Sequence, residues 1–101
     1  MHADTEAREL TELVHRWSSG DQDALEVLML RYGRLVVTAA RRGGVSAVEA
    51  EDVAQETWLS FLVHAGDIRD PARLASWLWT TSARFCRQYL KHWSPRQQAT
   101  P

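Results

Sequence analysis

The sequence predicts an all-α protein, a compact bundle of three to four helices. Apolar residues recur at helical spacing, and no stretch shows the sustained alternation of apolar and polar residues that indicates a strand. The chain has 101 residues, 45% of them hydrophobic and 25% charged, which is the size and composition of one globular domain. We therefore expect one domain over residues 1–95, with 96–101 as a tail or as the start of a linker to a second domain that this sequence does not include.

The first two helices are predicted from their apolar stripes and from the residues that bound them. The first helix begins near Asp4 or Thr5 and ends at Ser18-Ser19-Gly20. Asp21 is a good N-cap for the second helix, which ends at Gly43-Gly44. The two stripes are Leu10, Leu13, Val14 and Trp17, and then Ala24, Leu25, Leu28, Tyr32, Leu35, Val36 and Ala39.

A capping box predicts the start of the third helix. Ser46 and Glu49 have the required spacing: the serine oxygen accepts one free backbone amide and the glutamate reaches back to another. The helix is expected over residues 47–65 and is broken at Gly66. Along it, Asp52, Glu56 and Ser60 are four residues apart, with Gln55 beside them, so this face could receive arginines from a partner helix. The alternative is that these acids only favour the helix dipole and have no partner.

The fourth helix, expected over residues 71–93, begins at Asp70-Pro71 and ends at Ser94-Pro95. A helical wheel places one broad apolar arc towards the core: Leu74, Leu78, Ser82, Phe85, Cys86, Tyr89, Leu90 and Trp93, with Trp79 and Ala83 at one edge. The opposite arc contains Arg73, Trp77, Thr80, Arg84, Arg87, Gln88 and Lys91. An exposed Trp77 among cations could stack on an unpaired base while the cations neutralise phosphates. The alternative is that Trp77 packs on a neighbouring helix or loop.

Charge is sorted along the chain although the net charge is −1. Residues 1–30 carry seven acids and two bases, and residues 31–44 carry four arginines and no acid. Residues 45–70 carry six acids and one base, and residues 71–101 carry five bases and no acid. The basic C-terminal block could meet phosphate and the acidic middle block could meet a basic protein surface, unless both are solvated faces without a partner.

The sequence argues against enzyme chemistry, metal sites and cofactors. None of the four histidines has a second histidine three or four residues away, and Cys86 falls on the apolar arc. No nucleophile–base set or phosphate-binding glycine loop is visible. The longest uncharged apolar run, residues 35–40, is far too short to span a membrane, so a cytoplasmic location is expected.

Two motifs resemble region 2 of bacterial RNA polymerase sigma factors, most closely those of the extracytoplasmic-function type, group IV of the sigma-70 family. They are Asp52-Val53-Ala54-Gln55-Glu56-Thr57-Trp58 and, some twenty residues later, Trp77-Leu78-Trp79-Thr80-Thr81. The segment from Gly20 to Tyr32 is similar to the first conserved helix of that region. The resemblance covers about residues 10–93. It departs at Ser82-Ala83-Arg84, where many members have Ala-Arg-Asn.

The resemblance implies a transcription initiation domain that binds core RNA polymerase and recognises and melts the promoter minus-ten element. Asp52, Gln55 and Glu56 would then dock on the clamp helices of the largest polymerase subunit. The segment 64–71 would capture a base flipped from the single-stranded non-template strand, and the last helix would line that strand. The DNA-binding residues expected on this basis are His64, Asp67, Arg69, Arg73, Trp77, Thr80, Arg84, Gln88 and Lys91. An anti-sigma factor is a further partner that the resemblance allows.

Two other interpretations stay open at the level of sequence. One is a helical protein-interaction module, a domain held by an anti-sigma factor or a decoy without promoter melting. The other is a helix-turn-helix regulator that reads duplex DNA in the major groove. The long segment 64–71 and a tryptophan on the polar arc favour capture of a single strand over duplex reading.

Overall fold

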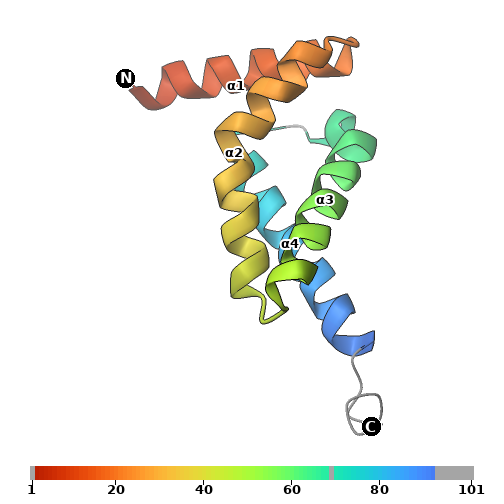
Figure 1. The fold of residues 1–101 in the computed structure, drawn as a ribbon. Coiled ribbons are helices and arrows are strands. Elements are labelled where there is room, and N and C mark those ends of the chain that lie inside the picture. The colour runs from red at the N-terminus through yellow and green to blue at the C-terminus, as the bar shows by residue number, and fades with distance from the viewer. Residues whose placement is uncertain (1, 69, 93–101) are drawn as a thin grey trace, which may run out of the picture.

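The computed structural model describes residues 2–68 and 70–92, and these residues are almost entirely helical. The α-helices are α1 (His2–Ser18), α2 (Gln22–Arg42), α3 (Ala47–His64) and α4 (Leu74–His92), and two short 3-10 turns, Ala65–Asp67 and Pro71–Arg73, lie between α3 and α4. In Figure 1, α1 lies across one end of the bundle, and α2, α3 and α4 pack side by side with α3 antiparallel to the other two. No strand occurs among the described residues. The all-α prediction is confirmed.

The residues expected to bound α2 and α3 act as predicted. The side chain of Asp21 accepts a hydrogen bond of 3.0 Å from the amide two residues on. Ser46 and Glu49 form the full capping box, with both reciprocal hydrogen bonds at 3.1 Å. Gly20 and Gly44 adopt positive φ angles of 98° and 85°, which place a glycine at each turn between helices.

Two helix starts differ from the prediction. The first helix begins at His2, two to three residues before the expected start at Asp4 or Thr5. The fourth is preceded by the 3-10 turn Pro71–Arg73, and regular α-helix begins only at Leu74. Asp70 holds this turn, since its Oδ1 accepts from the Ala72 amide at 3.1 Å and its carbonyl accepts from the Arg73 amide at 2.9 Å. Trp93, Ser94-Pro95 and the expected tail lie outside the described residues.

The core lies where all four helices meet. Phe61, Leu28, Leu74 and Leu78 are its largest fully buried hydrophobic residues. The buried residues of α1, which are Leu10, Leu13 and Val14, join the same cluster. A second, smaller cluster between the far ends of α2, α3 and α4 contains Ala40, Ala50, Val53 and Cys86.

One buried polar contact joins α3 to α4. The hydroxyl oxygens of Thr57 and Ser82 lie 3.0 Å apart, and both residues are fully buried. Each hydroxyl also lies 2.8 Å from the carbonyl four residues before it, that of Val53 or Leu78. Because each hydroxyl has one proton, one of them donates across the interface while the other donates to its own helix. Both groups are thereby satisfied without water.

Three large apolar residues of α4 are placed differently from the helical-wheel prediction. Trp77 does not project outward but is half-buried and packs on the core, with its ring edge-on to Phe61 of α3 at 6.2 Å, which is the alternative that the sequence left open. Trp79 and Leu90, expected towards the core, are exposed, Trp79 to 39%. A helical wheel describes one helix without its neighbours, so it does not show which flank another helix covers. Here the end of α3 covers the flank that holds Trp77, and nothing in the described residues covers the opposite flank to the same extent.

Candidate functional site

The acidic face of α3 has the composition predicted for it. Asp52 and Gln55 are exposed one turn apart, and Glu56 is partly buried. The hydroxyl of Tyr89 on α4 donates a 3.4 Å hydrogen bond to Oε1 of Glu56. Burial, together with the carboxylates of Glu56 and Asp52, raises the pKa of Tyr89 above its usual value, so the phenol keeps its proton. The structure therefore brings Asp52, Gln55 and Glu56 to one surface and joins Glu56 to α4 by a hydrogen bond.

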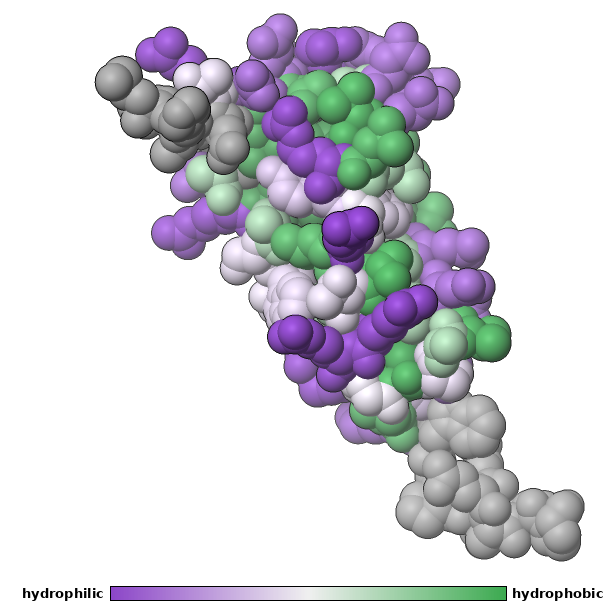
Figure 2. Space-filling view, turned by 60° about the vertical axis from the view of Figure 1, so that its left-hand side comes forward, coloured by the Kyte–Doolittle hydropathy of each residue, from purple (hydrophilic) through white to green (hydrophobic). Residues whose placement is uncertain are grey.

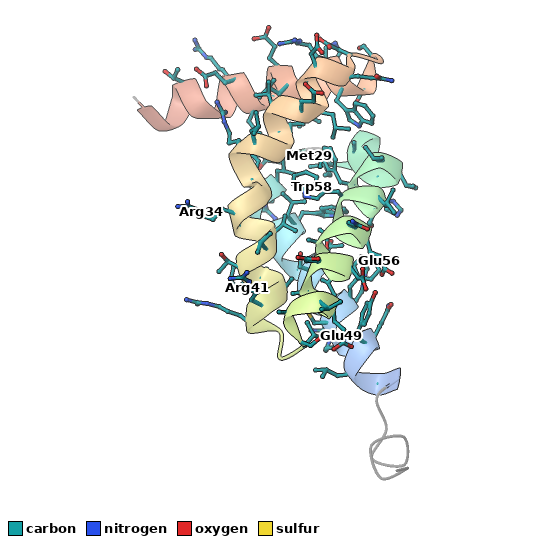
Figure 3. The ribbon with its side chains drawn as sticks, viewed as in Figure 1. Met29, Arg34, Arg41, Glu49, Glu56 and Trp58 are labelled. Atoms are coloured by element: carbon teal, nitrogen blue, oxygen red, sulfur yellow. The ribbon has the colours of Figure 1, made fainter. Side chains whose placement is uncertain are left out.

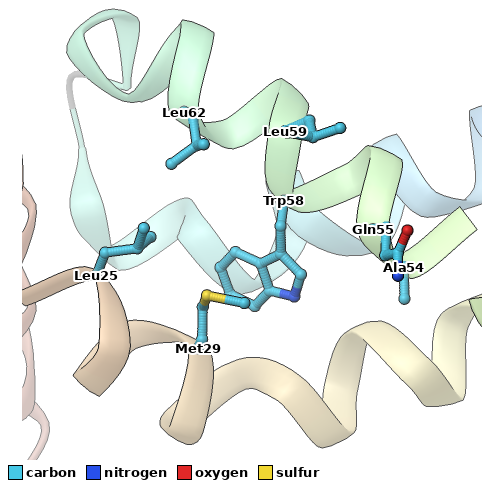
Figure 4. Close-up of a pocket in the computed structure, with 7 residues that line it drawn as sticks. All are labelled: Leu25, Met29, Ala54, Gln55, Trp58, Leu59 and Leu62. Carbon is cyan, nitrogen blue, oxygen red and sulfur yellow. The ribbon is translucent and has the colours of Figure 1, made fainter. Parts of the chain in front are cut away.

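An apolar groove lies directly beside this acidic face, between α2 and α3. It has a volume of about 350 Å³, and Figure 4 shows its lining: Leu25, Met29, Ala54, Gln55, Trp58, Leu59 and Leu62. Met29 and Trp58 face each other across it (Figures 3 and 4). Trp58 is held from beneath by an edge-on contact with Phe61 at 5.9 Å. Gln55 belongs to both surfaces, so polar and apolar contacts are available within one turn of α3.

This groove is not predicted by the sequence pattern. Met29, Leu59 and Leu62 are exposed large hydrophobic residues, and the sequence pattern assigns no role to Leu59 or Met29. The available signal is that Leu59 and Met29 are large apolar residues away from the core stripes of their helices. Such positions indicate either chance exposure or a contact surface.

A second hollow lies at the start of α4 and contains several of the expected DNA-binding residues. Its volume is about 430 Å³, and it is lined by Asp67, Ile68, Asp70, Arg73 and Trp77. Arg73 Nε is 3.8 Å from Asp70 Oδ2, and His64 Nδ1 is 3.4 Å from Asp67 Oδ2. Trp77 thus forms one wall of a pocket, in place of the freely projecting ring that the wheel predicted. Arg69 lies outside the described residues.

The other predicted DNA-binding residues form a row along the exposed side of α4. Thr80, Arg84, Gln88 and Lys91 are all exposed. The Arg84 guanidinium lies 5.6 Å from the ring centre of Phe85, which limits its freedom. In the described part of the chain, no carboxylate lies within ion-pairing distance of Arg84, Arg87 or Lys91. These positive charges are available to an external anion.

Two further observations concern metal sites and membrane spans among the described residues. Within residues 2–68 and 70–92, no three histidine, cysteine or acidic side chains gather closely enough to hold a metal ion. Among the same residues, no helix combines the length and apolar character needed to cross a membrane.

The family model described as Sigma-70 region 2 matches residues 28–94. The chain belongs to this family. The matched range contains most of α2 and the whole of α3, the two 3-10 turns and α4, so it includes the acidic face, most of the groove and the basic row described above. The sequence-based assignment to sigma region 2 is confirmed, and the domain is not an enzyme.

Two curated relatives support the assignment. The chain is 29% identical to the RNA polymerase sigma-H factor of Pseudomonas aeruginosa over 79 residues, which are 78% of this chain and 41% of the relative. It is 33% identical to the RNA polymerase sigma factor CarQ of Myxococcus xanthus over 79 residues, which are 78% of this chain and 45% of the relative. The chain therefore spans less than half the length of these relatives. No solved structure matches it closely enough to be compared.

Proposed function

We propose that this sigma region 2 domain acts in transcription initiation, where it binds core RNA polymerase through α3 and holds the unpaired non-template strand of the minus-ten element through α4 and the turns before it. The observation that carries the proposal is the separation of charge between these two helices. Exposed acidic and amide groups lie on α3, and cations without an ion-pair partner among the described residues lie on α4, beside the Trp77 pocket. Both named relatives are RNA polymerase sigma factors.

The polymerase contact would use both parts of the α3 surface. Asp52 and Glu56 can accept charge-assisted hydrogen bonds from arginines of a partner helix, which fix orientation. The neighbouring groove around Trp58 supplies apolar area, and a buried apolar centre with a polar rim is the usual anatomy of an interface. A helical partner with apolar residues flanked by basic ones fits this surface.

The DNA contact would combine strand neutralisation with capture of a base. Arg84 and Lys91 are two turns apart on the same side of α4, and can contact successive phosphates of a single strand. The pocket that Trp77 lines, with Asp67 and Arg73 at its edges, offers an aromatic wall and hydrogen-bonding groups to an extruded base. Unstacking a base costs a few kcal/mol, which contacts in such a pocket can offset.

A protein-interaction module without promoter melting is the second candidate, and the apolar groove between α2 and α3 favours it. Such a module would use the groove and the acids of α3 but would have no need of the cations on α4. The two candidates therefore differ in what the α4 row does.

The test separates the two faces by substitution. We expect Asp52→Asn with Glu56→Gln to weaken binding to core polymerase at least about tenfold, as loss of charge-assisted hydrogen bonds does, and to leave binding of single-stranded DNA by the free chain unchanged. Arg84→Gln with Lys91→Gln should weaken binding of single-stranded DNA and leave binding to core polymerase unchanged. Glu12→Gln, on the exposed side of α1, is the charge-matched control for one acid. Wild-type polymerase affinity in the α3 variant would contradict the proposed polymerase face, and unchanged DNA affinity in the α4 variant would favour the protein-interaction module.

A further inference from the structure

The outer side of α2 carries a basic face that the proposed function does not use. Arg31, Arg34, Arg41 and Arg42 are spaced so that they lie on one side of the helix, and all four are exposed. Figure 3 shows Arg34 and Arg41 pointing away from the bundle. Figure 2, which brings this side of the molecule forward, shows strongly hydrophilic side chains lying among hydrophobic residues and residues of intermediate hydropathy.

Most of this charge has no ion-pair partner among the described residues. Arg31 is paired with Glu9 at 3.2 Å. In residues 2–68 and 70–92, no carboxylate lies within ion-pairing distance of Arg34, Arg41 or Arg42. Exposed arginines are common on protein surfaces and do not by themselves indicate a binding site. Evidence for a binding site here depends on the residue of α4 that lies beside them.

That neighbour is Trp79. It lies seven residues, about two helical turns, before Cys86 on nearly the same side of α4. Cys86 faces α2, because its thiol contacts the Ala40 carbonyl at 3.4 Å. Since α2 and α4 run in the same direction (Figure 1), two turns back from this contact brings Trp79 to about the level of Arg31 and Arg34. The helical spacing therefore places a partly exposed indole on the side of α4 that faces α2, at the junction beside the arginine face.

An indole beside available guanidinium groups is suited to one class of ligand. Arginines neutralise phosphates, and an aromatic face stacks on a base that is not paired. An acidic protein surface would use the arginines but would gain little from the indole.

We propose that Trp79 and the arginines Arg34, Arg41 and Arg42 form a second contact surface for single-stranded DNA, which continues the path from α4 across the α2–α4 junction to the outer side of α2. This inference rests on the proposed function, because it extends the strand already assigned to α4. Arginine contacts should appear mainly in the salt dependence of binding, and the indole contact mainly in affinity for unpaired bases.

The experiment measures fluorescence anisotropy of labelled single-stranded DNA with the whole chain, over a series of salt concentrations. For a single strand, the slope of log affinity against log salt changes by about 0.7 for each phosphate that the protein no longer neutralises. Arg34→Gln with Arg41→Gln should therefore reduce the slope by about 1.4. Trp79→Ala should lower affinity about 5- to 150-fold at unchanged slope, and should leave duplex affinity unchanged because paired bases do not offer their faces.

Arg8→Gln is the matched control, since Arg8 is an exposed arginine on α1, beside Thr11, Glu12 and His15, and far from the junction in sequence. It should change neither slope nor affinity. Thermal unfolding by circular dichroism checks that every variant is folded.

The outcomes separate this inference from the proposed function. If Arg84→Gln with Lys91→Gln weakens binding while the α2 and Trp79 variants bind as the wild type does, the second surface is wrong and the α4 assignment stands. If no variant changes binding of single strands, both are wrong. If the α2 variants weaken only the binding of core polymerase, the face is a protein contact and the inference is overturned.

Discussion

The hydroxyl of Tyr89 on α4 donates a hydrogen bond to the Glu56 carboxylate on α3, over 3.4 Å. This contact joins α4, which we propose binds DNA, with α3, which we propose binds the polymerase. It is also a contact that responds to pH, because the phenol can donate only while it is protonated.

Stability should therefore fall at high pH through Tyr89. Burial and the nearby carboxylates of Glu56 and Asp52 raise the pKa of this phenol in the folded protein above the ordinary value of 10.0. A raised pKa means that the folded state holds the proton more tightly, so the stabilisation is complete below the unfolded value and is lost as pH rises through the folded pKa. Urea unfolding from about pH 8 to about pH 11, which brackets the ordinary phenol pKa, should show a steeper loss for the wild type than for Tyr89→Phe. Parallel pH profiles would contradict this.

The two tryptophans of the Trp-Leu-Trp motif should differ in their effect on stability. Trp77 packs against Phe61 and the core, so Trp77→Ala should cost about 2–4 kcal/mol because burial is reduced and a cavity is left behind. Trp79 is 39% exposed, and Trp79→Ala should cost about 1 kcal/mol. Denaturant unfolding of both variants provides the measurement, and an equal or reversed order would show that the ring environments are assigned wrongly.

The buried hydroxyl pair should show coupling between α3 and α4. Thr57→Val leaves the Ser82 hydroxyl without its cross-helix partner and should cost about 1–3 kcal/mol. The further change Ser82→Ala should cost less in that background than in the wild type, because both polar groups are then gone. A double-mutant cycle on unfolding free energies measures the difference. Simple additivity would mean that the two hydroxyls do not interact.

The C-terminal end of α2 lies so close to α4 that there is no room for a methyl side chain at Gly43. A Cβ built there overlaps the Sγ and Cβ of Cys86, so Gly43→Ala should cost about 1–3 kcal/mol by overpacking. Cys86→Ala removes the sulfur and should recover part of that loss. Gly33→Ala is the control, since a Cβ on that helical glycine meets nothing within 4 Å and should stabilise the helix by about 0.5–1 kcal/mol. If Gly43→Ala is as stable as the wild type, the packing between these helices is looser than the structure shows.

The helix ends and the central packing were predictable because they depend on local rules. Asp21 and the Ser46–Glu49 box are caps that a few neighbouring residues specify, and the stripe positions Leu28, Leu74 and Leu78 are buried as their periodicity requires. That Asp52, Gln55 and Glu56 share one surface was predictable for the same reason, because they lie on one helix at fixed spacing; their role stays a prediction.

The surroundings of the site were not predictable in this way. Whether Trp77 or Trp79 is covered depends on where the end of α3 and the turn Ala65–Asp67 lie, and no wheel of α4 contains that information. The groove around Trp58 is likewise built from two helices whose approach sets its width. The residue pattern predicts which residues share a face of a helix, and the packing of the helices determines which of these faces are exposed to solvent.

The proposed joint action of α3 and α4 is tested by binding of a labelled single-stranded non-template minus-ten oligonucleotide, followed by fluorescence anisotropy at low salt with and without core RNA polymerase. We expect weak binding by the chain alone and much tighter binding when polymerase is added, with the increase abolished in Asp52→Asn/Glu56→Gln. Affinity that polymerase does not change would contradict the assignment of α3 and α4 to one initiation function.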